Sequence, residues 1–583
     1  MNWPFSPVPP VPGPIDVRRT PIRRFAAVGS LLLLACLHFG GAPAASAAAS
    51  DRGPEIVVKL EARAQLERGS DGAYRVGRPD VDRALNRIGA QAVAPVFPGG
   101  QGKNLEIRQR YGLDRYYKIR LRPGADARAA AAEMRKTRGV ELATEGGAKT
   151  LNVESATGAT AEVVPNDPSF NLQWALQNTG VDPGGALGIP LEADADIDAT
   201  DAWGLTTGSA NVTVGIVSSG IDFAEPELAG RFYENTAEAT GVPGVDDDGN
   251  GYVDDVRGWD FIEGDNNPGH VPDNPLNPNQ ATLDTGSTRI ASVLGANGNN
   301  AAGIAGVDWA CRLLSTRVFS GSFFASTADI MAAYLYSAEL GARVVISNIL
   351  FFDLTPGELT LIIDTVAAAQ AAGAVIVVPV GSTLDGSNTE LYPAPLPGVL
   401  GVATSEGQDL HCDLARCGSW SVTGNQVAVT APGRRIVGID PVAGGGPGTT
   451  AYLNGGGIAA SIVAGTVALA FAANPALTVG EASAIIRATA DDLVGDPGED
   501  TPGRDGYHGD GRVNAFRAVQ AAAPRGARAR RACRAAHAAP RASRARRCRG
   551  LDQAWLEREF TRLADELIDQ REAPGFERGQ ASP

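Results

Sequence analysis

Apolar and polar residues follow a regular succession between residues 165 and 523. Uninterrupted apolar runs of strand length recur there, each bounded by glycine, proline or polar residues. The runs that we predict as strands cover residues 212–219, 311–319, 342–350, 374–381 and 399–404. Helix-like segments at 325–340 and 358–372 lie between them. Apolar strands that alternate with helices are typical of a sheet covered on both faces, so we predict an α/β, doubly wound parallel sheet.

A smaller unit precedes this region. Residues 54–150 show strand and helix patterns in the order β-α-β-β-α-β, which predicts a small α+β ferredoxin-like domain. A polar stretch rich in small residues then leads to the larger domain at 165–523.

The first 47 residues have the pattern of a targeting segment. Four arginines precede an apolar run at 25–39, and small residues at Ala45 and Ala47 suit cleavage by a signal peptidase. Three alternatives stay open: a signal peptide at 1–47, a lipoprotein signal with lipid on Cys36, and an uncleaved anchor. The first two predict a secreted or cell-envelope protein.

The C-terminal part divides in two. Residues 524–550 are rich in arginine and alanine and predict a disordered linker. Residues 551–573 predict an amphipathic helix with an acidic face. This helix either docks on its own chain, pairs with the same helix of a second copy or binds a partner. The arginines next to it suit contact with an envelope or membrane surface.

Composition and charge limit the classes of partner that the protein can have. The 583 residues carry a formal net charge of −15, although the linker alone holds ten arginines and no acid. An acidic main body excludes nucleic acid as its partner. In an exported protein, Cys412 and Cys417 predict a disulfide, Cys533 and Cys548 are candidates for a second, and Cys311 is expected to be buried.

Several stretches, in this order, together resemble the subtilisin-like serine protease family. They are "PNDPSFNLQWALQNTG", "DADIDATDAWGLTTGSANVTVGIVSSGIDFAEPELAG", "NNAAGIAGVDWACRLLSTRVF", "YPAPLPGVLGVAT", "VAVTAPG" and "GRVNAFRAV". The resemblance spans about 165–520, and it implies a subtilisin-like fold. The unit at 54–150 resembles the inhibitory propeptide of that family.

The family's catalytic side chains are replaced at the matching positions. In the family a serine attacks the peptide carbonyl, a histidine takes its proton, an aspartate orients the histidine, and an asparagine stabilises the oxyanion. The resemblance places the aspartate at Ser218 in "VSSGID", the histidine at Thr285 in "DTGSTRIAS", the asparagine at Ser382 in "PVGST" and the serine at Gly457 in "GGGIAAS". Removing one triad member typically lowers turnover by about four to six decades. The chain is therefore predicted not to be an active enzyme.

Substitutes for the lost groups are not evident. Ser461 lies in an apolar helix and is expected to be a packed small residue, while His270, His411 and His508 are expected to be solvated loop residues. Phe351 stands where the family's substrate strand has glycine, so we expect the groove to be partly filled.

The stretch "DDDGNGYVDD" resembles the calcium loop of many family members. Its predicted Ca²⁺ ligands are Asp246, Asp248, Asn250, the Tyr252 carbonyl and Asp254. The spacing matches the front of an EF-hand loop, but Arg257 replaces the closing glutamate. We predict a structural Ca²⁺, since carboxylates packed this densely repel one another without a cation.

These observations predict a secreted pseudoprotease with a binding or scaffolding role towards an unknown protein or peptide. Its propeptide-like unit should stay covalently attached, because family members remove theirs by self-cleavage. Two alternatives remain: an active serine endopeptidase with an unrecognised catalytic set, and a calcium-dependent structural protein of the cell envelope anchored by its tail.

Overall fold

A computed structural model describes residues 54–61, 63, 66–68, 74–99, 102–146, 165–269, 285–320, 323–441, 447–492 and 494–523. The chain divides into one unit at 1–52 and one at 53–583, and every element below belongs to the second. The signal segment with Cys36, the linker at 524–550, the helix at 551–573, Cys533, Cys548 and His270 lie outside the described residues.

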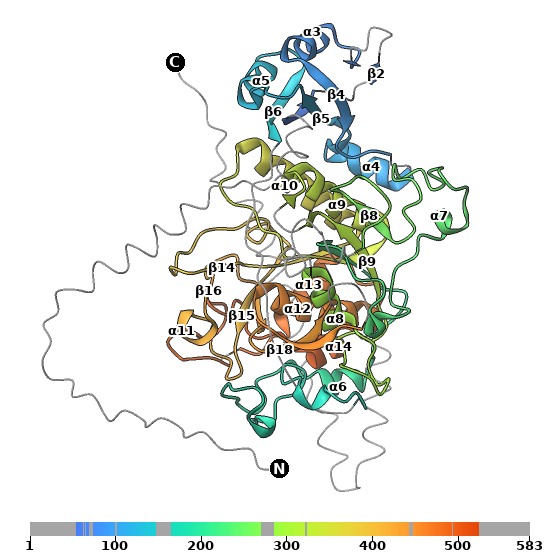
Figure 1. The fold of residues 1–583 in the computed structure, drawn as a ribbon. Helices are drawn as coiled ribbons and strands as arrows, with labels where there is room; N and C mark the ends of the chain where they lie inside the picture. Colours follow the sequence, from blue (N-terminus) through green and yellow to red (C-terminus); the bar gives the residue numbers. More distant parts are fainter. Residues whose placement is uncertain are drawn as a thin grey trace, which may run out of the picture. The chain divides into compact units, whose positions relative to one another are not determined.

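The main body is built on a sheet of seven parallel strands (Figure 1). Their order across the sheet is β17 (Val429–Pro432), β15 (Leu400–Ser405), β13 (Val375–Pro379), β12 (Ala342–Ser347), β7 (Thr213–Ser218), β9 (Arg312–Arg317) and β8 (Gly258–Asp260). All five predicted strands are present, and only β15 runs one residue beyond its predicted range. The predicted doubly wound parallel sheet is confirmed.

Helices cover both faces of this sheet because successive strand residues point to opposite sides. On β12, Val344 and Ile346 pack into one core and Val345 into the other. The first core is covered by α8 (Gly286–Gly295), α12 (Gly456–Ala473), α13 (Val479–Ala488) and α14 (Ala515–Ala522). The second is covered by α9 (Thr327–Glu339) and α10 (Pro356–Ala372), the two helices predicted from the sequence.

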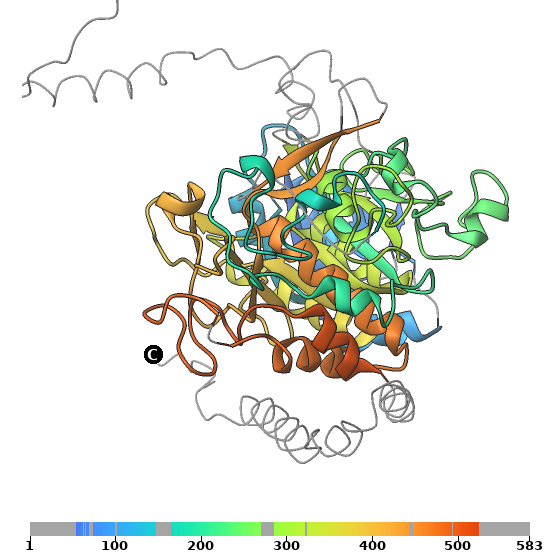
Figure 2. The ribbon, with the colours of Figure 1, turned by 90° about the horizontal axis from the view of Figure 1, so that it is seen from below.

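Helix α12 lies inside the body in both ribbon views (Figures 1 and 2). It packs against five strands of the sheet and against α8, α13 and α14. Among the described helices it alone has the length and hydropathy to cross a membrane, and its residues are buried in the protein core.

Shorter elements complete the body. They are α6 (Ala199–Trp203), α7 (Thr236–Thr240), α11 (Leu414–Cys417) and the strand pairs β10 (Phe319–Ser320) with β11 (Phe323–Phe324), β14 (Ser382–Thr383) with β16 (Trp420–Ser421), and β18 (Ile436–Asp440) with β19 (Thr449–Leu453).

The N-terminal unit has the predicted βαββαβ order. Its antiparallel sheet is ordered β4 (Ala90–Pro95), β5 (Tyr116–Leu121), β1 (Glu55–Leu60) and β6 (Val140–Gly146). Its helices are α3 (Pro79–Ile88) and α5 (Ala127–Arg135), with an added helix α4 (Gly102–Arg110) between β4 and β5 and a short pair β2 (Glu67–Arg68) with β3 (Tyr74–Arg75). One face of the sheet packs on α3 and α5.

The other face of that sheet packs on the main body. Val57 and Tyr116 belong to the same apolar core as residues of α9 and α10, and Gly357 of α10 lies close to Thr144 of β6. Lys59 Nζ and the Tyr116 hydroxyl both donate to Asp364 of α10, at 2.9 and 3.0 Å. Both faces of the small sheet are therefore covered.

A buried ion pair anchors α4 at the same interface. Arg108 donates through Nε to Glu339 of α9 at 2.7 Å, and the two side chains are only 3% and 6% exposed. Other guanidinium hydrogens are donated to the carbonyls of Phe97 and Gly99. This satisfied network contributes to holding the N-terminal unit on the body.

We expect Arg108→Met to lower the free energy of unfolding by about 3 kcal/mol, because it leaves the Glu339 carboxylate buried and unpaired. Urea unfolding followed by circular dichroism measures the loss. Arg83→Met is the matched control, since Arg83 pairs with Asp80 in solvent at 64% and 47% side-chain exposure, and it should cost less than about 1 kcal/mol. Equal losses in the two variants would contradict the anchoring role of Arg108.

Candidate functional site

The candidate site lies where the order of the sheet changes direction. On one side of β7 lie β9 and β8, and on its other side lie β12, β13, β15 and β17. In open α/β sheets the crevice at the carboxyl ends of such neighbouring strands is the usual ligand site. Ser218 ends β7, and Asn348 directly follows β12.

Two helices begin at the same crevice. Thr285 is the N-cap residue of α8, and a Cβ built on Gly286 would lie 3.4 Å from Ser218 Oγ, 3.5 Å from Asn348 Nδ2 and 3.6 Å from Ser219 Oγ. Ser287 N donates to Ser219 Oγ at 3.2 Å. The start of α8 is thus held against the ends of β7 and β12.

Gly457 brings α12 to this point. A Cβ at Gly457 would lie 3.1 Å from Asn348 Cβ, which is closer than most side chains tolerate. The structure therefore gathers the three predicted triad positions, Ser218, Thr285 and Gly457, around Asn348. We name this arrangement of the end of β7, Asn348 and the first turns of α8 and α12 the junction.

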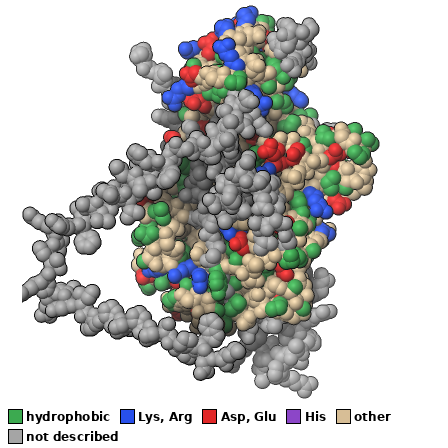
Figure 3. Space-filling model, viewed as in Figure 1, with side chains coloured by type: hydrophobic (Ala, Val, Ile, Leu, Met, Phe, Trp, Pro, Cys, Tyr) green, Lys and Arg blue, Asp and Glu red, His purple; other side chains and the backbone are tan. Residues whose placement is uncertain are grey.

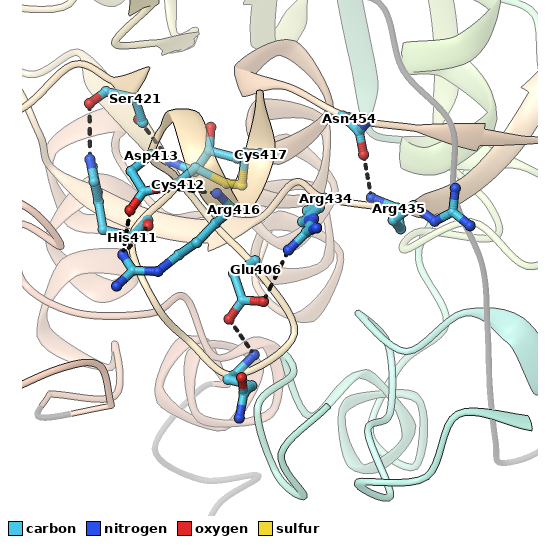
Figure 4. The surroundings of a disulfide bond; sticks show 12 residues. Glu406, His411, Cys412, Asp413, Arg416, Cys417, Ser421, Arg434, Arg435 and Asn454 are labelled. Carbon is cyan, nitrogen blue, oxygen red and sulfur yellow. Dashed lines mark hydrogen bonds and ion pairs between the residues drawn. A yellow bond between two sulfur atoms is a disulfide. The ribbon is translucent and has the colours of Figure 1, made fainter. Parts of the chain in front are cut away.

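Ser382 lies beside a cavity of about 680 Å³. Asn454 and Gly455, which immediately precede α12, line the same cavity, as do Cys412 and Cys417. The predicted Cys412–Cys417 disulfide is present, and Figure 4 shows it together with Asn454 and the neighbouring arginines. Cys311 is buried, as predicted.

The groups that the structure brings together do not include a nucleophile hydrogen-bonded to a general base. Ser218 Oγ is buried and makes no hydrogen bond among the described residues. Ser461 Oγ donates to the Ile458 carbonyl at 2.6 Å inside α12, in agreement with its expected role as a packed residue.

Neither described histidine is hydrogen-bonded to a hydroxyl: His411 Nε2 pairs with the Ser421 carbonyl at 2.9 Å, and both ring nitrogens of His508 lack partners. Both rings are buried, so the prediction that these two loop histidines are solvated is wrong.

Phe351 is fully buried and occupies a backbone-paired position. Its N–H donates to the Tyr392 carbonyl at 2.8 Å, and its own carbonyl accepts from Tyr392 N at 2.9 Å. The backbone groups of Phe351 are therefore already bonded within the chain and cannot pair with an added peptide strand.

The acidic loop lies between α7 and β8. Carboxylate oxygens of Glu238, Asp248 and Asp255 lie within 4.8 Å of one another. Of the predicted Ca²⁺ ligands, only Asp248 is in this group. Asp246 instead accepts from the backbone of Asn250 and Gly251 at 3.0 and 2.8 Å. In Figure 3 a group of acidic side chains lies on the right-hand part of the body, at the position of β8 in Figure 1.

Hydrogen bonds fix the other predicted ligands of the loop. Asn250 Nδ2 donates to Asp248 and Asp255 at 3.0 and 2.9 Å, and Asp254 Oδ2 accepts from Gly244 N at 2.8 Å. The Tyr252 ring is buried among the aromatic rings of Trp259, Phe261 and Tyr336.

The electrostatics of the converging carboxylates fit a cation. Burial and the nearby charge of Asp248 raise the pKa of Asp255 to about 7, although hydrogen bonds from Tyr336, Asn250 and Asn235 act in the opposite direction. Three oxygens of this kind are ligands that Ca²⁺ prefers. Glu238 and Asp255 were missed from the sequence, because their approach to Asp248 depends on how the segment from α7 to β8 folds on itself.

Comparisons with known proteins agree with this fold. A model of the subtilase family matches residues 209–507. A thermophilic serine proteinase of Bacillus sp. (strain AK1) is 27% identical over 321 residues, which is 54% of this chain and 64% of the relative. The cell wall-associated protease of Bacillus subtilis (strain 168) is 24% identical over 394 residues, covering 64% of this chain and 38% of the relative.

Two further comparisons cover more of the chain. An extracellular protease of Xanthomonas campestris pv. campestris is 27% identical over 471 residues, covering 78% of this chain and 71% of the relative. Among solved structures, fervidolysin from Fervidobacterium pennivorans, described as a keratinolytic enzyme related to subtilisin, matches with a TM-score of 0.56 and 17% identity. That match covers 80% of this chain and 61% of fervidolysin and supports the fold alone. This chain spans 64%, 38% and 33% of the first three curated relatives.

His411, close to the cavity, should make stability depend on pH. Burial lowers the pKa of its ring from 6.5 to about 4. Between these values the unfolded chain binds a proton that the folded chain does not, so the free energy of unfolding falls as the pH is lowered, by about 3 kcal/mol from this residue. Urea unfolding at about pH 7 and pH 4 should show this loss in the natural chain and a smaller one in His411→Gln. The same loss in both proteins would contradict this role for His411.

Proposed function

The chain belongs to the subtilase family, and we propose that it is a secreted member that binds polypeptides and does not cut them. The observation that carries this proposal is Gly457 at the start of α12, where the family's nucleophile would stand. A glycine offers no atom that can attack a carbonyl.

The neighbouring groups do not compensate for that loss. Thr285 has no imidazole to accept a proton, and Ser218 is fully buried with a hydroxyl that is not a base. Absence of an oxyanion asparagine at Ser382 lowers turnover by roughly two to three further decades. Hydrolysis through this junction is therefore not expected.

The same geometry supports a binding role. The cavity beside Gly455 is about 680 Å³, a size that accommodates a large side chain or a small ligand. The N-terminal unit packs on α9 and α10 through apolar residues and a buried ion pair. Because Gly457 offers no nucleophile for self-cleavage, we propose that the unit remains covalently attached to the body.

We further propose that the acidic loop binds a structural Ca²⁺. Asp248 is the ligand shared by the sequence pattern and the converging carboxylates, and Glu238 and Asp255 are the others that the geometry favours. A bound cation would neutralise their mutual repulsion and stiffen the loop, with no part in a reaction.

Secretion is supported by the relatives and by the cysteines. One relative is named an extracellular protease and another a cell wall-associated protease. The Cys412–Cys417 disulfide suits an oxidising compartment. The sequence pattern of residues 1–47 leaves both a cleaved signal and a lipoprotein signal at Cys36 as routes.

A fluorophosphonate probe tests the loss of catalysis. We expect the purified chain to label no more than its heat-denatured form, because the junction offers no activated serine. An active subtilisin-type protease added to the same sample is the positive control for the probe.

Labelling of the folded chain above that background would contradict the proposal and favour the active endopeptidase. In that case His270→Ala and Ser461→Ala would identify the catalytic set, since His270 lies outside the described residues and Ser461 is the hydroxyl nearest in sequence to Gly457.

Calcium should raise the thermal unfolding midpoint of the chain relative to a chelator. At about one hundred times the dissociation constant, binding adds about 2.7 kcal/mol, which corresponds to a shift of several degrees. Asp248→Asn should abolish most of this shift, because it removes a carboxylate from the converging group. Differential scanning calorimetry with CaCl₂ and with EDTA measures both values.

Asp201→Asn is the control, because Asp201 is an exposed acid on α6, away from the acidic loop. An equal calcium shift in Asp248→Asn and Asp201→Asn would contradict the assignment, as would the absence of a shift in the natural chain.

A further inference from the structure

The outer face of the N-terminal unit concentrates positive charge. Helices α3 and α5 cover the face of the small sheet that is turned away from the main body. The basic residues on and around these helices form what we call the basic face: Arg78, Arg83, Arg87, Arg122, Arg128, Arg135, Lys136 and Arg138. In Figure 3 blue side chains lie on this part of the unit, where Figure 1 shows α3 and α5. The whole chain has a net charge of −15, so the basic face is opposite in sign to the protein that carries it.

The acids of these two helices do not neutralise the basic face. Asp80 pairs with Arg83, and Glu133 accepts from Arg87 Nε at 2.9 Å. Asp82 accepts a backbone N–H from the loop before α3 at 2.6 Å. Bases that form no ion pair with a described residue are Arg78, Arg122, Arg135, Lys136 and Arg138. Their charges therefore remain available to a partner.

Packing holds two of these bases at opposite ends of α3. A Cβ built on Gly139 would lie 3.3 Å from Arg78 Nη1, so this guanidinium lies beside the residue that follows Arg138. A Cβ on Gly89, the residue after α3, would lie 3.5 Å from Arg122 Nε. Since α3 also contacts α5, the bases form a fixed array across both helices. Side chains that are already ordered lose less entropy when they bind a partner.

The basic face offers charge without an apolar anchor. Among the described residues, the large apolar side chains that are exposed all lie in the main body. A partner of this face is therefore recognised by its negative charge. Guanidinium groups bind phosphate especially well, because their planar N–H groups donate two parallel hydrogen bonds to it. This chemistry favours a partner that presents many phosphate groups.

A phospholipid surface is the source of phosphate that fits this protein best. Its headgroups move within the plane of the membrane, so they can match the fixed spacing of the bases. Clusters of about four to eight Lys or Arg residues bind acidic membranes, and each residue near the surface strengthens binding by about fivefold. Every export route left open for residues 1–47 passes through a membrane, and the N-terminal unit begins soon afterwards, at residue 54.

We propose that the basic face docks the N-terminal unit on a membrane surface rich in acidic phospholipids. The contact is electrostatic, with no insertion of apolar side chains, so salt weakens it. The inference rests on the proposed function, because the basic face holds the body at a membrane only while the N-terminal unit stays attached.

Sedimentation with lipid vesicles tests the proposal on the purified full chain. One set of vesicles contains phosphatidylcholine alone, and the other contains phosphatidylcholine and phosphatidylglycerol in equal amounts. The chain should sediment with the acidic vesicles only, and it should be released in about 1 M NaCl, where the Debye length falls to about 3 Å. Equal binding to both sets, or no binding to the acidic vesicles, would overturn the proposal.

Two double variants locate the contact. Lys136→Gln with Arg138→Gln removes two unpaired charges from the basic face and should lower partitioning onto acidic vesicles by about twenty-five-fold. Arg110→Gln with Arg257→Gln is the matched control, because both side chains are exposed and lie outside the basic face, on α4 and in the main body. The control should bind nearly as well as the natural chain. Equal binding of the two variants, with native circular dichroism, would overturn the location and assign the binding to other charges.

Heparin tests the other source of negative charge. A heparin column that retains the natural chain more strongly than the Lys136→Gln, Arg138→Gln variant, without any binding to acidic vesicles, would overturn the lipid assignment in favour of a soluble polyanion.

Gel electrophoresis of the sedimented protein separates this proposal from the proposed function. Intact chain in the pellet supports both. Intact chain that does not bind acidic vesicles would overturn only the role of the basic face. A pellet that holds the released N-terminal unit without the body would instead contradict the lasting attachment of that unit.

Discussion

The close approach of α12 to the end of β12 is the contact on which the rest of the structure depends. Gly457 and Asn348 meet there at a distance that leaves little room for a side chain. The remainder of α12 is apolar and buried between the sheet and its neighbouring helices. Burial along the whole helix therefore fixes the position of Gly457 at the junction.

The N-terminal unit and the acidic loop are parts of one packing arrangement. Gly99 and Gly251 lie so close that side chains at either position would clash with the backbone of the other segment. Helix α9 contacts both regions, since Tyr336 donates to Asp255 at 2.7 Å and Glu339 pairs with Arg108. A cation in the loop would therefore strengthen the surface on which the N-terminal unit rests.

Much of the fold followed from local pattern, and the remainder depended on tertiary contacts. Continuous valine and isoleucine runs predicted β7, β12 and β13, because strands buried on both faces need apolar residues at every position. The three-residue edge strand β8 and the short β17 were missed, since neither is long enough to produce a periodic signal.

Some residues of the candidate site were also predicted from the sequence, and others were found only in the structure. The order of the family-like stretches placed Ser218, Thr285 and Gly457, which the structure gathers at the junction. The sequence did not reveal Asn348, because it becomes significant only through the distant starts of α8 and α12. Nor did it reveal Glu238 and Asp255, because their approach to Asp248 depends on how this segment folds. Nor did it reveal that Phe351 pairs with Tyr392, since the partner lies in a separate loop.

The central claim is that this chain holds a protease frame that cannot cut, including its own N-terminal unit. Intact-mass measurement of the chain, secreted by a host that lacks extracellular proteases, tests it most directly. The account predicts one polypeptide that contains both the unit at 54–146 and the body from 165 onward. A specific cut within 147–164, releasing the N-terminal unit from the body, would contradict it.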